Sequence, residues 1–139
     1  VDRKSKQDFY SLDEIKGKFD LITMFEVIEH MKINNFIKYS KKLIKLLNPG
    51  GLFILSTPNV THPWAFRSDI THIQHYPAPD LYSILRYLGF KEIFMFRVHQ
   101  EIKSGSMYLF YLIREFITRV LLRVFGVDYS FGIMAIARK

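Results

Sequence analysis

The sequence contains no cysteine among its 139 residues. This absence excludes a disulfide framework and any metal site built on thiolates. No internal repeat and no low-complexity tract is present either. A chain without cysteine is typical of a reducing compartment, so we expect a cytoplasmic protein.

Acidic residues are the minority among the charged residues. Lysine and arginine number 20 against 13 aspartates and glutamates, which gives a net charge of +7. A basic excess favours anionic partners such as nucleic acid, anionic lipid or a phosphorylated substrate, although a solvated lysine-rich surface has the same composition. Hydrophobic residues make up 49% of the chain and charged residues 24%, so we expect one globular domain.

The chain also lacks an uninterrupted apolar segment of membrane-spanning length. Residues 107–126 come near to one, but Arg114, Glu115, Arg119 and Arg123 interrupt them. Isolated charges at the bilayer centre cost about 2.5–3.5 kcal/mol each, so we reject a membrane span. These charges fall in one half of a helical wheel, which predicts an amphipathic helix. Such a helix lies in a membrane interface, against a second subunit or on its own sheet.

The remaining pattern is that of an α/β domain. The apolar run at residues 19–25 predicts a buried strand, and apolar positions spaced by three and four from about Asn34 to Leu47 predict a helix. The turn residues "NPGG" at 48–51 end this helix, and "LFILST" at 52–57 predicts a second strand. A strand, a helix and a strand in this order indicate a parallel sheet.

After the second strand comes a long loop, residues 58–79, which contains His62, His72 and His75. Long loops without secondary structure inside a domain are usually functional or disordered. The sequence beyond the loop predicts a short helix from about Pro79 to Gly89 and two more strands at residues 91–98 and 132–139.

Four short motifs carry a family resemblance. They are "EVIEH" at a strand end, "NPGG" before a strand, "STPN" after it and "LGF" before the next strand. In this order and spacing they resemble the C-terminal half of class I S-adenosylmethionine-dependent methyltransferases. More narrowly, they are similar to the branch with the ubiquinone-biosynthesis O-methyltransferases and the methyltransferases of bacterial polysaccharide and lipid gene clusters. The resemblance covers essentially residues 6–139.

The resemblance implies a Rossmann-like, doubly wound sheet of seven strands with the last strand antiparallel. The strands of this chain would be the fourth to the seventh. The family's glycine-rich G-x-G-x-G loop, which follows the first strand, is absent here. We therefore expect residues 1–139 to be a partial methyltransferase domain, a fragment with a helical insertion at about 106–126. A degenerate relative, or a docking half-domain completed by a partner, is the alternative.

The resemblance also implies the cofactor, S-adenosylmethionine, and the places where this chain would contact it. Met24 and Phe25, at the end of the first strand, would contact the methionine part of the cofactor. Asp8 and Phe9 match the acidic and apolar pair that contacts adenine in the family. The sulfonium makes the methyl group electrophilic, so the protein's main task is to align an in-line transfer.

A base is needed only to deprotonate a hydroxyl acceptor. His30, with Glu29 beside it, is one candidate, and His72 or His75 in the following loop is an equal rival. Each of these side chains has an alternative structural role: His30 and Glu29 could orient the turn that follows the strand. The loop histidines could fix the loop to the sheet.

Glu26, Glu29 and His30 form an E-x-x-E-H run. In small-RNA terminal 2′-O-methyltransferases such a run, with a downstream histidine, binds a divalent ion that holds the terminal ribose. Ubiquinone-type relatives have the same run, so our leading interpretation involves no metal. It is methyl transfer to oxygen of a small-molecule, saccharide or lipid-linked acceptor, with peripheral membrane contact through Met107–Gly126. Metal-dependent RNA methylation is the alternative, which the clustering of lysines without interleaved aromatics disfavours.

Overall fold

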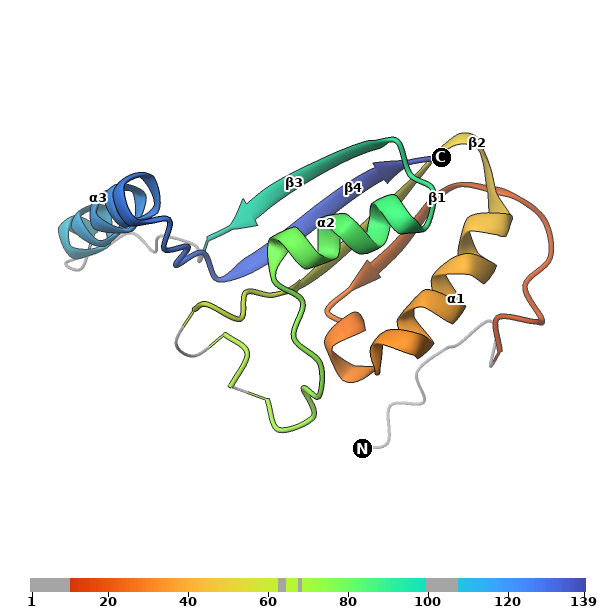
Figure 1. The fold of residues 1–139 in the computed structure, drawn as a ribbon, viewed down its shortest axis with the longest axis horizontal. Coiled ribbons are helices and arrows are strands. Elements are labelled where there is room, and N and C mark those ends of the chain that lie inside the picture. Colours follow the sequence, from red (N-terminus) through yellow and green to blue (C-terminus); the bar gives the residue numbers. More distant parts are fainter. Residues whose placement is uncertain (1–10, 63–64, 68, 100–107) are drawn as a thin grey trace.

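In the part of the chain that the structure describes, the sheet has four strands, with two helices on one face and a third helix beyond one end (Figure 1). The structure is a computed structural model that describes residues 11–62, 65–67, 69–99 and 108–139. The strands are β1 (Phe19–Phe25), β2 (Leu47–Pro58), β3 (Glu92–Val98) and β4 (Gly132–Arg138). The helices are α1 (Ile33–Leu46), α2 (Ala78–Tyr87) and α3 (Tyr108–Phe125), and a short 3-10 helix, η1, spans Ile28–His30.

The strand order confirms the expected α/β topology. The order across the sheet is β1-β2-β4-β3. β1 and β2 pair in parallel, whereas β4 lies antiparallel between β2 and β3. The carboxyl ends of β1, β2 and β3 therefore meet at one edge of the sheet, which is where α/β folds bind their ligands.

The start of β2 differs from the prediction, because "NPGG" lies inside the strand rather than before it. Phe19 pairs with Leu47 and Leu21 pairs with Leu52, so Asn48–Gly51 bulge out opposite Asp20. The Asn48 amide donates to Asp20 Oδ1 over 2.7 Å, which closes the bulge. A Cβ at Gly51 would lie 3.0 Å from the Asn48 carbonyl oxygen and 3.2 Å from the Phe19 carbonyl oxygen, so this bulge favours glycine there.

The hydrophobic core lies between the sheet and the two helices α1 and α2. Phe36 of α1 packs edge-on against Tyr76, with ring centroids 5.4 Å apart, and Phe53 of β2 stacks on Phe90. The predicted inner faces of both helices are the ones that are buried. The fully buried core residues that these elements contribute include Phe36, Leu47, Phe53, Leu55, Leu81, Leu85, Ala135 and Ala137.

The opposite face of the sheet is open among the described residues. Phe19, Leu21 and Phe25 of β1 point to this face and are exposed, and so are Phe94 and Phe96 of β3. The outer edge of β1 also has no neighbouring strand in this part of the chain. Parallel sheets are normally covered on both faces, so the described residues show one of the two layers of a doubly wound fold.

Helix α3 spans Tyr108–Phe125 and agrees with the predicted amphipathic helix to within one residue at each end. Met107 lies outside the described residues. None of its side chains is buried. Its half-buried residues share the side of the helix that faces the rest of the protein; they are Tyr111, Arg114, Glu115, Thr118, Leu121 and Leu122. The strongly apolar half of α3 therefore faces away from the protein. Within the described ranges, no helix is both long enough and apolar enough to cross a bilayer.

We predict that Phe36→Ala lowers the free energy of unfolding by about 3–5 kcal/mol, the usual cost of deleting a buried phenylalanine side chain. Phe36 is fully buried and packs against Tyr76, so removing its ring leaves a cavity in the core. Urea denaturation measures the loss, with Lys38→Ala on the exposed side of α1 as the control. Equal stabilities for the two variants would contradict the proposed core.

Candidate active site

The carboxyl end of β1 turns sharply at Glu26. Its φ is +51°, the single positive value at a non-glycine residue among the described residues. Such a conformation costs about 1 kcal/mol or more and persists only where neighbouring groups enforce it. Ser56 at the end of β2 does so: its hydroxyl donates to Glu26 Oε1 over 2.6 Å, and its carbonyl accepts from the Glu26 amide over 3.2 Å.

This turn directs Glu29 into the protein from η1. The Glu29 side chain is 0% exposed, and its Oε2 accepts a hydrogen bond from the Thr57 hydroxyl over 3.1 Å. The other oxygen, Oε1, is buried and has no hydrogen-bond partner in the described part of the chain. Burial raises the pKa of Glu29 and outweighs the hydrogen bonds from its own backbone and from Thr57. The nearby Glu26 carboxylate acts in the same direction as burial.

The loop after β2 is tied to the same turn. The Glu29 carbonyl accepts hydrogen bonds from the amides of Ile73 and Gln74, over 2.9 and 3.1 Å. The Tyr76 hydroxyl donates to the carbonyl of Met31 over 3.3 Å. Burial, together with the charge of Glu29, raises the pKa of Tyr76 to about 12, so this hydroxyl keeps its proton. These contacts place the histidine-bearing loop over the carboxyl end of β1.

Two of the predicted histidines meet at the unpartnered oxygen of Glu29. His30 Nε2 lies 3.9 Å from Glu29 Oε1, and His72 Nε2 lies 4.0 Å from the same oxygen. The two imidazole rings are 4.8 Å apart between centroids. Both separations from Oε1 are too long for a hydrogen bond. The structure therefore brings together three of the four predicted catalytic residues, Glu29, His30 and His72.

The fourth predicted residue, His75, lies elsewhere in the loop. The Phe66 ring contacts both loop histidines, with centroids 5.1 Å from His72 and 4.0 Å from His75. His75 is exposed and does not belong to the group of convergent side chains around Glu29. Its role as a base remains a prediction.

Sequence reasoning missed two residues that support this group, Thr57 and Asp69. Thr57 holds Glu29 from β2, and Asp69 Oδ1 accepts hydrogen bonds from the hydroxyl and the amide of Thr71 over 2.7 and 2.8 Å. These bonds from Thr71 lower the pKa of Asp69. Asp followed two residues later by Thr is a turn signal, but it does not show which side chain the turn would meet.

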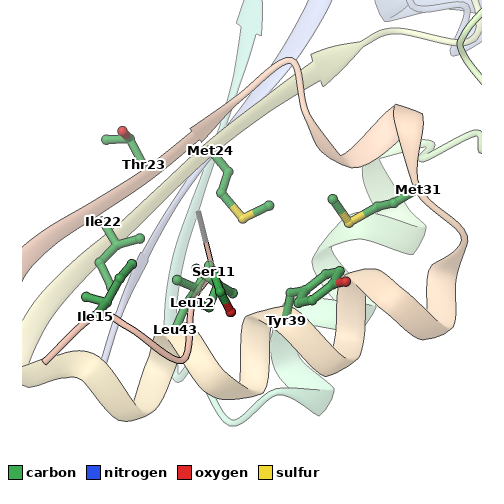
Figure 2. A pocket seen from close by; sticks show the side chains of 9 residues that line it. All are labelled: Ser11, Leu12, Ile15, Ile22, Thr23, Met24, Met31, Tyr39 and Leu43. Carbon is green, nitrogen blue, oxygen red and sulfur yellow. The ribbon is translucent and has the colours of Figure 1, made fainter. Parts of the chain in front are cut away.

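The predicted cofactor contacts divide between the two faces of β1. Met24 lines an apolar hollow of about 570 Å³ between β1, α1 and the segment before β1, where its side chain points toward that of Met31 (Figure 2). Phe25 points to the open face of the sheet and is exposed. Asp8 and Phe9 lie outside the described residues. The described residues thus fit one wall of a cofactor pocket and do not form a complete one.

A second hollow, of about 680 Å³, lies between the loop after β2, the start of α2 and the segment after α3. Asn59, the last residue of the "STPN" motif, is one of the residues that line it. The Asn59 side-chain amide donates to the carbonyls of Asp128 and Ser130 over 3.1 and 3.0 Å. The Asp128 carboxylate accepts from the Ser130 amide over 3.0 Å and from Arg97 Nε over 2.9 Å. The motif therefore fixes the chain between α3 and β4.

We predict that Asp128 makes stability depend on pH in the acid range. Partial burial would raise the pKa of Asp128, but hydrogen bonds from Ser130 and Arg97 outweigh it and hold the pKa below its ordinary value of 3.8. A carboxyl group with a lowered folded-state pKa stabilises the fold above the unfolded-state pKa. This stabilisation is lost as the pH falls through the folded-state pKa.

The free energy of unfolding of the wild type should therefore decline more steeply between about pH 5 and pH 2.5 than that of Asp128→Asn. Urea denaturation at a series of pH values measures both slopes. Parallel slopes would show that the carboxylate contributes nothing to the acid dependence.

Comparisons with known proteins agree with this architecture. A family profile described as a methyltransferase domain matches residues 1–93. No curated protein matches the chain. Among solved structures, the chain is similar to a SAM-dependent methyltransferase from Archaeoglobus fulgidus, with a TM-score of 0.67 and 21% identity. The match covers 92% of this chain and 63% of the archaeal one.

Two further structures show the same fold. One is the phosphoethanolamine N-methyltransferase 2 of Haemonchus contortus in complex with S-adenosyl-L-methionine. Its TM-score is 0.55 at 16% identity, and the match covers 93% of this chain and 36% of the nematode chain. The other is an O-methyltransferase family protein from Burkholderia thailandensis, with a TM-score of 0.53, 13% identity and coverage of 88% and 31%. This chain thus spans between about a third and two thirds of the length of these structures.

The Rossmann-like arrangement predicted from the motifs is confirmed by the sheet order and by these structures. The family profile covers well over half of the sequence, from the region before β1 to the first residues of β3. The chain therefore belongs to the methyltransferase-domain family.

Proposed function

We propose that the protein is an S-adenosylmethionine-dependent methyltransferase that acts on a hydroxyl oxygen of a small-molecule, saccharide or lipid-linked acceptor. The observation that carries this proposal is the meeting of two imidazole nitrogens, His30 Nε2 and His72 Nε2, at the carboxylate of Glu29. This group lies at the carboxyl ends of β1 and β2, where α/β folds bind ligands. Family membership supports the reaction class.

The described residues would hold one side of the cofactor. Met24 and the backbone at the end of β1 offer an apolar wall, and the enforced turn at Glu26 keeps that strand end in one conformation. S-adenosylmethionine supplies a methyl group that its sulfonium charge makes electrophilic. The chain spans 63% of the archaeal structure and 36% of the nematode one. The opposite wall, with the glycine-rich loop of the family, would then come from the rest of the protein.

An imidazole beside a buried carboxylate is suited to take a proton from a hydroxyl group. His72 is the better placed of the two histidines to act as a base, because its side chain is only 7% exposed and its Nδ1 is fixed by the Phe66 carbonyl over 2.7 Å. His30 is 36% exposed and lies closer to solvent. The Glu29 carboxylate would stabilise the imidazolium that forms when His72 accepts the proton.

We predict that His72→Asn lowers the rate of methyl transfer by about 10²–10⁴-fold, the usual contribution of a general base. The affinity for S-adenosylhomocysteine should not change, because His72 does not line the cofactor wall. Calorimetric titration of S-adenosylhomocysteine into the full-length protein measures binding. Transfer of a labelled methyl group to a panel of glycans and lipid-linked phenols measures the rate.

His75→Asn is the matched control, since His75 lies in the same loop but does not face Glu29. It should retain most of the activity. Failure of the full-length protein to bind S-adenosylhomocysteine would overturn the proposed function. An equal loss of rate in the two variants would show that the loop, and not the imidazole of His72, matters.

The exposed half of α3 supports a membrane-proximal acceptor. Seven of its residues form a continuous apolar strip that faces away from the protein: Leu109, Phe110, Ile113, Phe116, Ile117, Val120 and Val124. Arg119 and Arg123 are exposed beside this strip. An amphipathic helix with aromatic and aliphatic residues on one face and arginines at its border is suited to the surface of an anionic bilayer. The net charge of +7 also favours binding to an anionic bilayer.

We predict that the full-length protein co-sediments with vesicles that contain phosphatidylglycerol and only weakly with pure phosphatidylcholine. The double variant Arg119→Glu and Arg123→Glu should weaken this binding by about tenfold or more, because each basic residue near an anionic surface contributes about 1 kcal/mol. Phe116→Ser should also weaken it, because burying a phenylalanine side chain contributes about 1.5–3 kcal/mol.

Tyr87→Ser is the control for Phe116→Ser, because Tyr87 is 67% exposed on α2 and Phe116 is 68% exposed on α3. It should leave vesicle binding unchanged. Binding that does not respond to any change on α3 would contradict the membrane contact. Concentration-dependent dimerisation abolished by Phe116→Ser, without vesicle binding, would assign this face to a second copy of the chain.

A further inference from the structure

We propose that the hollow of about 680 Å³ beside α2 binds the hydrocarbon chain of the methyl acceptor. This inference rests on the proposed function and deepens it, because it selects a lipid acceptor over a free saccharide. The hollow lies between the loop after β2, the start of α2, the end of β3 and the end of α3. Its volume is typical of ligand pockets, which measure about 300–1,000 Å³.

The hollow lies at the same edge of the sheet as the candidate active site. Asn59, which lines it, comes two residues after Thr57, whose hydroxyl group donates to Glu29. Pro77, which also lines it, comes directly after Tyr76, whose pKa responds to the charge of Glu29. Two residues of extended chain span at most about 7 Å. One molecule can therefore place a hydroxyl group near Glu29 and a chain in the hollow.

The walls of the hollow are mainly apolar. Tyr82 lines it with its ring, and because this residue is exposed its hydroxyl group can remain in water. Apolar side chains that converge from several elements are suited to an apolar ligand, because binding removes their surface from water. The other apolar residues that line the hollow are Pro77, Ala78, Pro79, Met95, Leu122 and Val127.

The polar side chains of the hollow already have hydrogen-bond partners. The Asn59 amide donates to the carbonyls of Asp128 and Ser130, and its oxygen accepts from the Thr61 hydroxyl over 2.9 Å. The Asp128 carboxylate accepts from the Ser130 amide and from Arg97 Nε. The Arg97 side chain is exposed, so its remaining N–H groups can reach water. A saccharide would lose hydrogen bonds to water that these side chains do not replace.

The start of α2 disfavours an anionic group in the hollow. Helix N-termini bind phosphate through free backbone N–H groups and the positive end of the helix dipole. At the start of α2, however, Pro77 and Pro79 have no N–H group. Asp80 adds a negative charge in the first turn. The charged end of a lipid acceptor would therefore lie outside the hollow.

Leu122 connects the hollow to the surface of α3. It also lines a smaller hollow of about 320 Å³ on α3, together with Phe116, Arg119, Val120 and Arg123. Phe116 and Val120 belong to the apolar strip that faces away from the protein. Apolar surface thus continues from the face of α3 proposed to contact the bilayer to the hollow beside the active site. This continuity favours a chain that reaches the hollow from a membrane.

The test is calorimetric titration of the full-length protein with a series of phenols from 4-butylphenol to 4-octylphenol, at concentrations at which they do not aggregate. In the wild type, each added methylene should raise the affinity about twofold to fourfold, as expected for partial to complete burial of a CH₂ group. Leu122→Trp should fill part of the hollow. It should therefore weaken binding of 4-octylphenol at least tenfold and change that of 4-butylphenol by less than about twofold.

Leu121→Trp is the matched control, because Leu121 is also half-buried on α3 but lines neither of the two hollows. It should keep the chain-length dependence of the wild type. Tyr82→Glu is a second test, which places a charge in the hollow from α2. It should weaken binding of 4-octylphenol at least tenfold. Because Tyr82 is exposed, this variant should keep the circular dichroism spectrum of the wild type.

An affinity that does not rise with chain length, or that rises equally in the wild type and in Leu122→Trp, would overturn the inference. So would a rise that Phe116→Ser removes and Leu122→Trp does not, because the chains would then bind to the strip on α3. Titration of S-adenosylhomocysteine into the same samples separates these results from a failure of the proposed function. Chain-length dependence without S-adenosylhomocysteine binding would keep the chain site and overturn the methyltransferase. S-adenosylhomocysteine binding without chain-length dependence would do the reverse.

Discussion

The burial of one carboxylate, Glu29, is the constraint on which the candidate site depends. A charged oxygen can be held inside a protein only if neighbouring groups compensate for the loss of water. Thr57 from β2 provides one hydrogen bond, and the backbone of the same glutamate receives the amides of Ile73 and Gln74. A single residue thus joins the end of β1, the end of β2 and the loop that follows. Moving β2 or the loop would break the hydrogen bonds to Glu29 Oε2 or to the Glu29 carbonyl.

The turn at Glu26 is a consequence of the same constraint. For Glu29 to point inward three residues after a strand, the chain must leave the sheet abruptly. The left-handed backbone of Glu26 provides that change of direction, and Ser56 stabilises it from the neighbouring strand. The E-x-x-E-H run therefore combines two different carboxylates. Glu26 fixes the backbone near the surface, whereas Glu29 places a buried carboxyl group next to the histidines.

Local pattern was sufficient to predict the helices and the strands, apart from the start of β2. The antiparallel last strand was predicted from the family resemblance. Long-range contacts decide the rest. His72 and His75 are equivalent in sequence, and only the positions of Phe66 and Glu29 distinguish them. Asp69 supports His30 only through Thr71, a contact that depends on the loop folding back onto η1. The pattern at Asn48–Gly51 predicted a simple turn. The bulge depends on Asp20 of the neighbouring strand, and the sequence does not show that Asp20 lies opposite.

Among the described residues the edge of β1 is unpaired, which has a consequence for handling these residues in isolation. Unpaired strand edges next to an exposed apolar surface are templates for association with other chains, and proteins normally protect them with charges, prolines or covering elements. Asp20 is the one charged residue of β1. Its neighbours Phe19 and Leu21 lie on the open side of the sheet and are exposed. Produced alone, these residues should therefore tend toward inclusion bodies and soluble aggregates. Covering this edge and face with further protein, rather than a change of buffer, is the physical remedy.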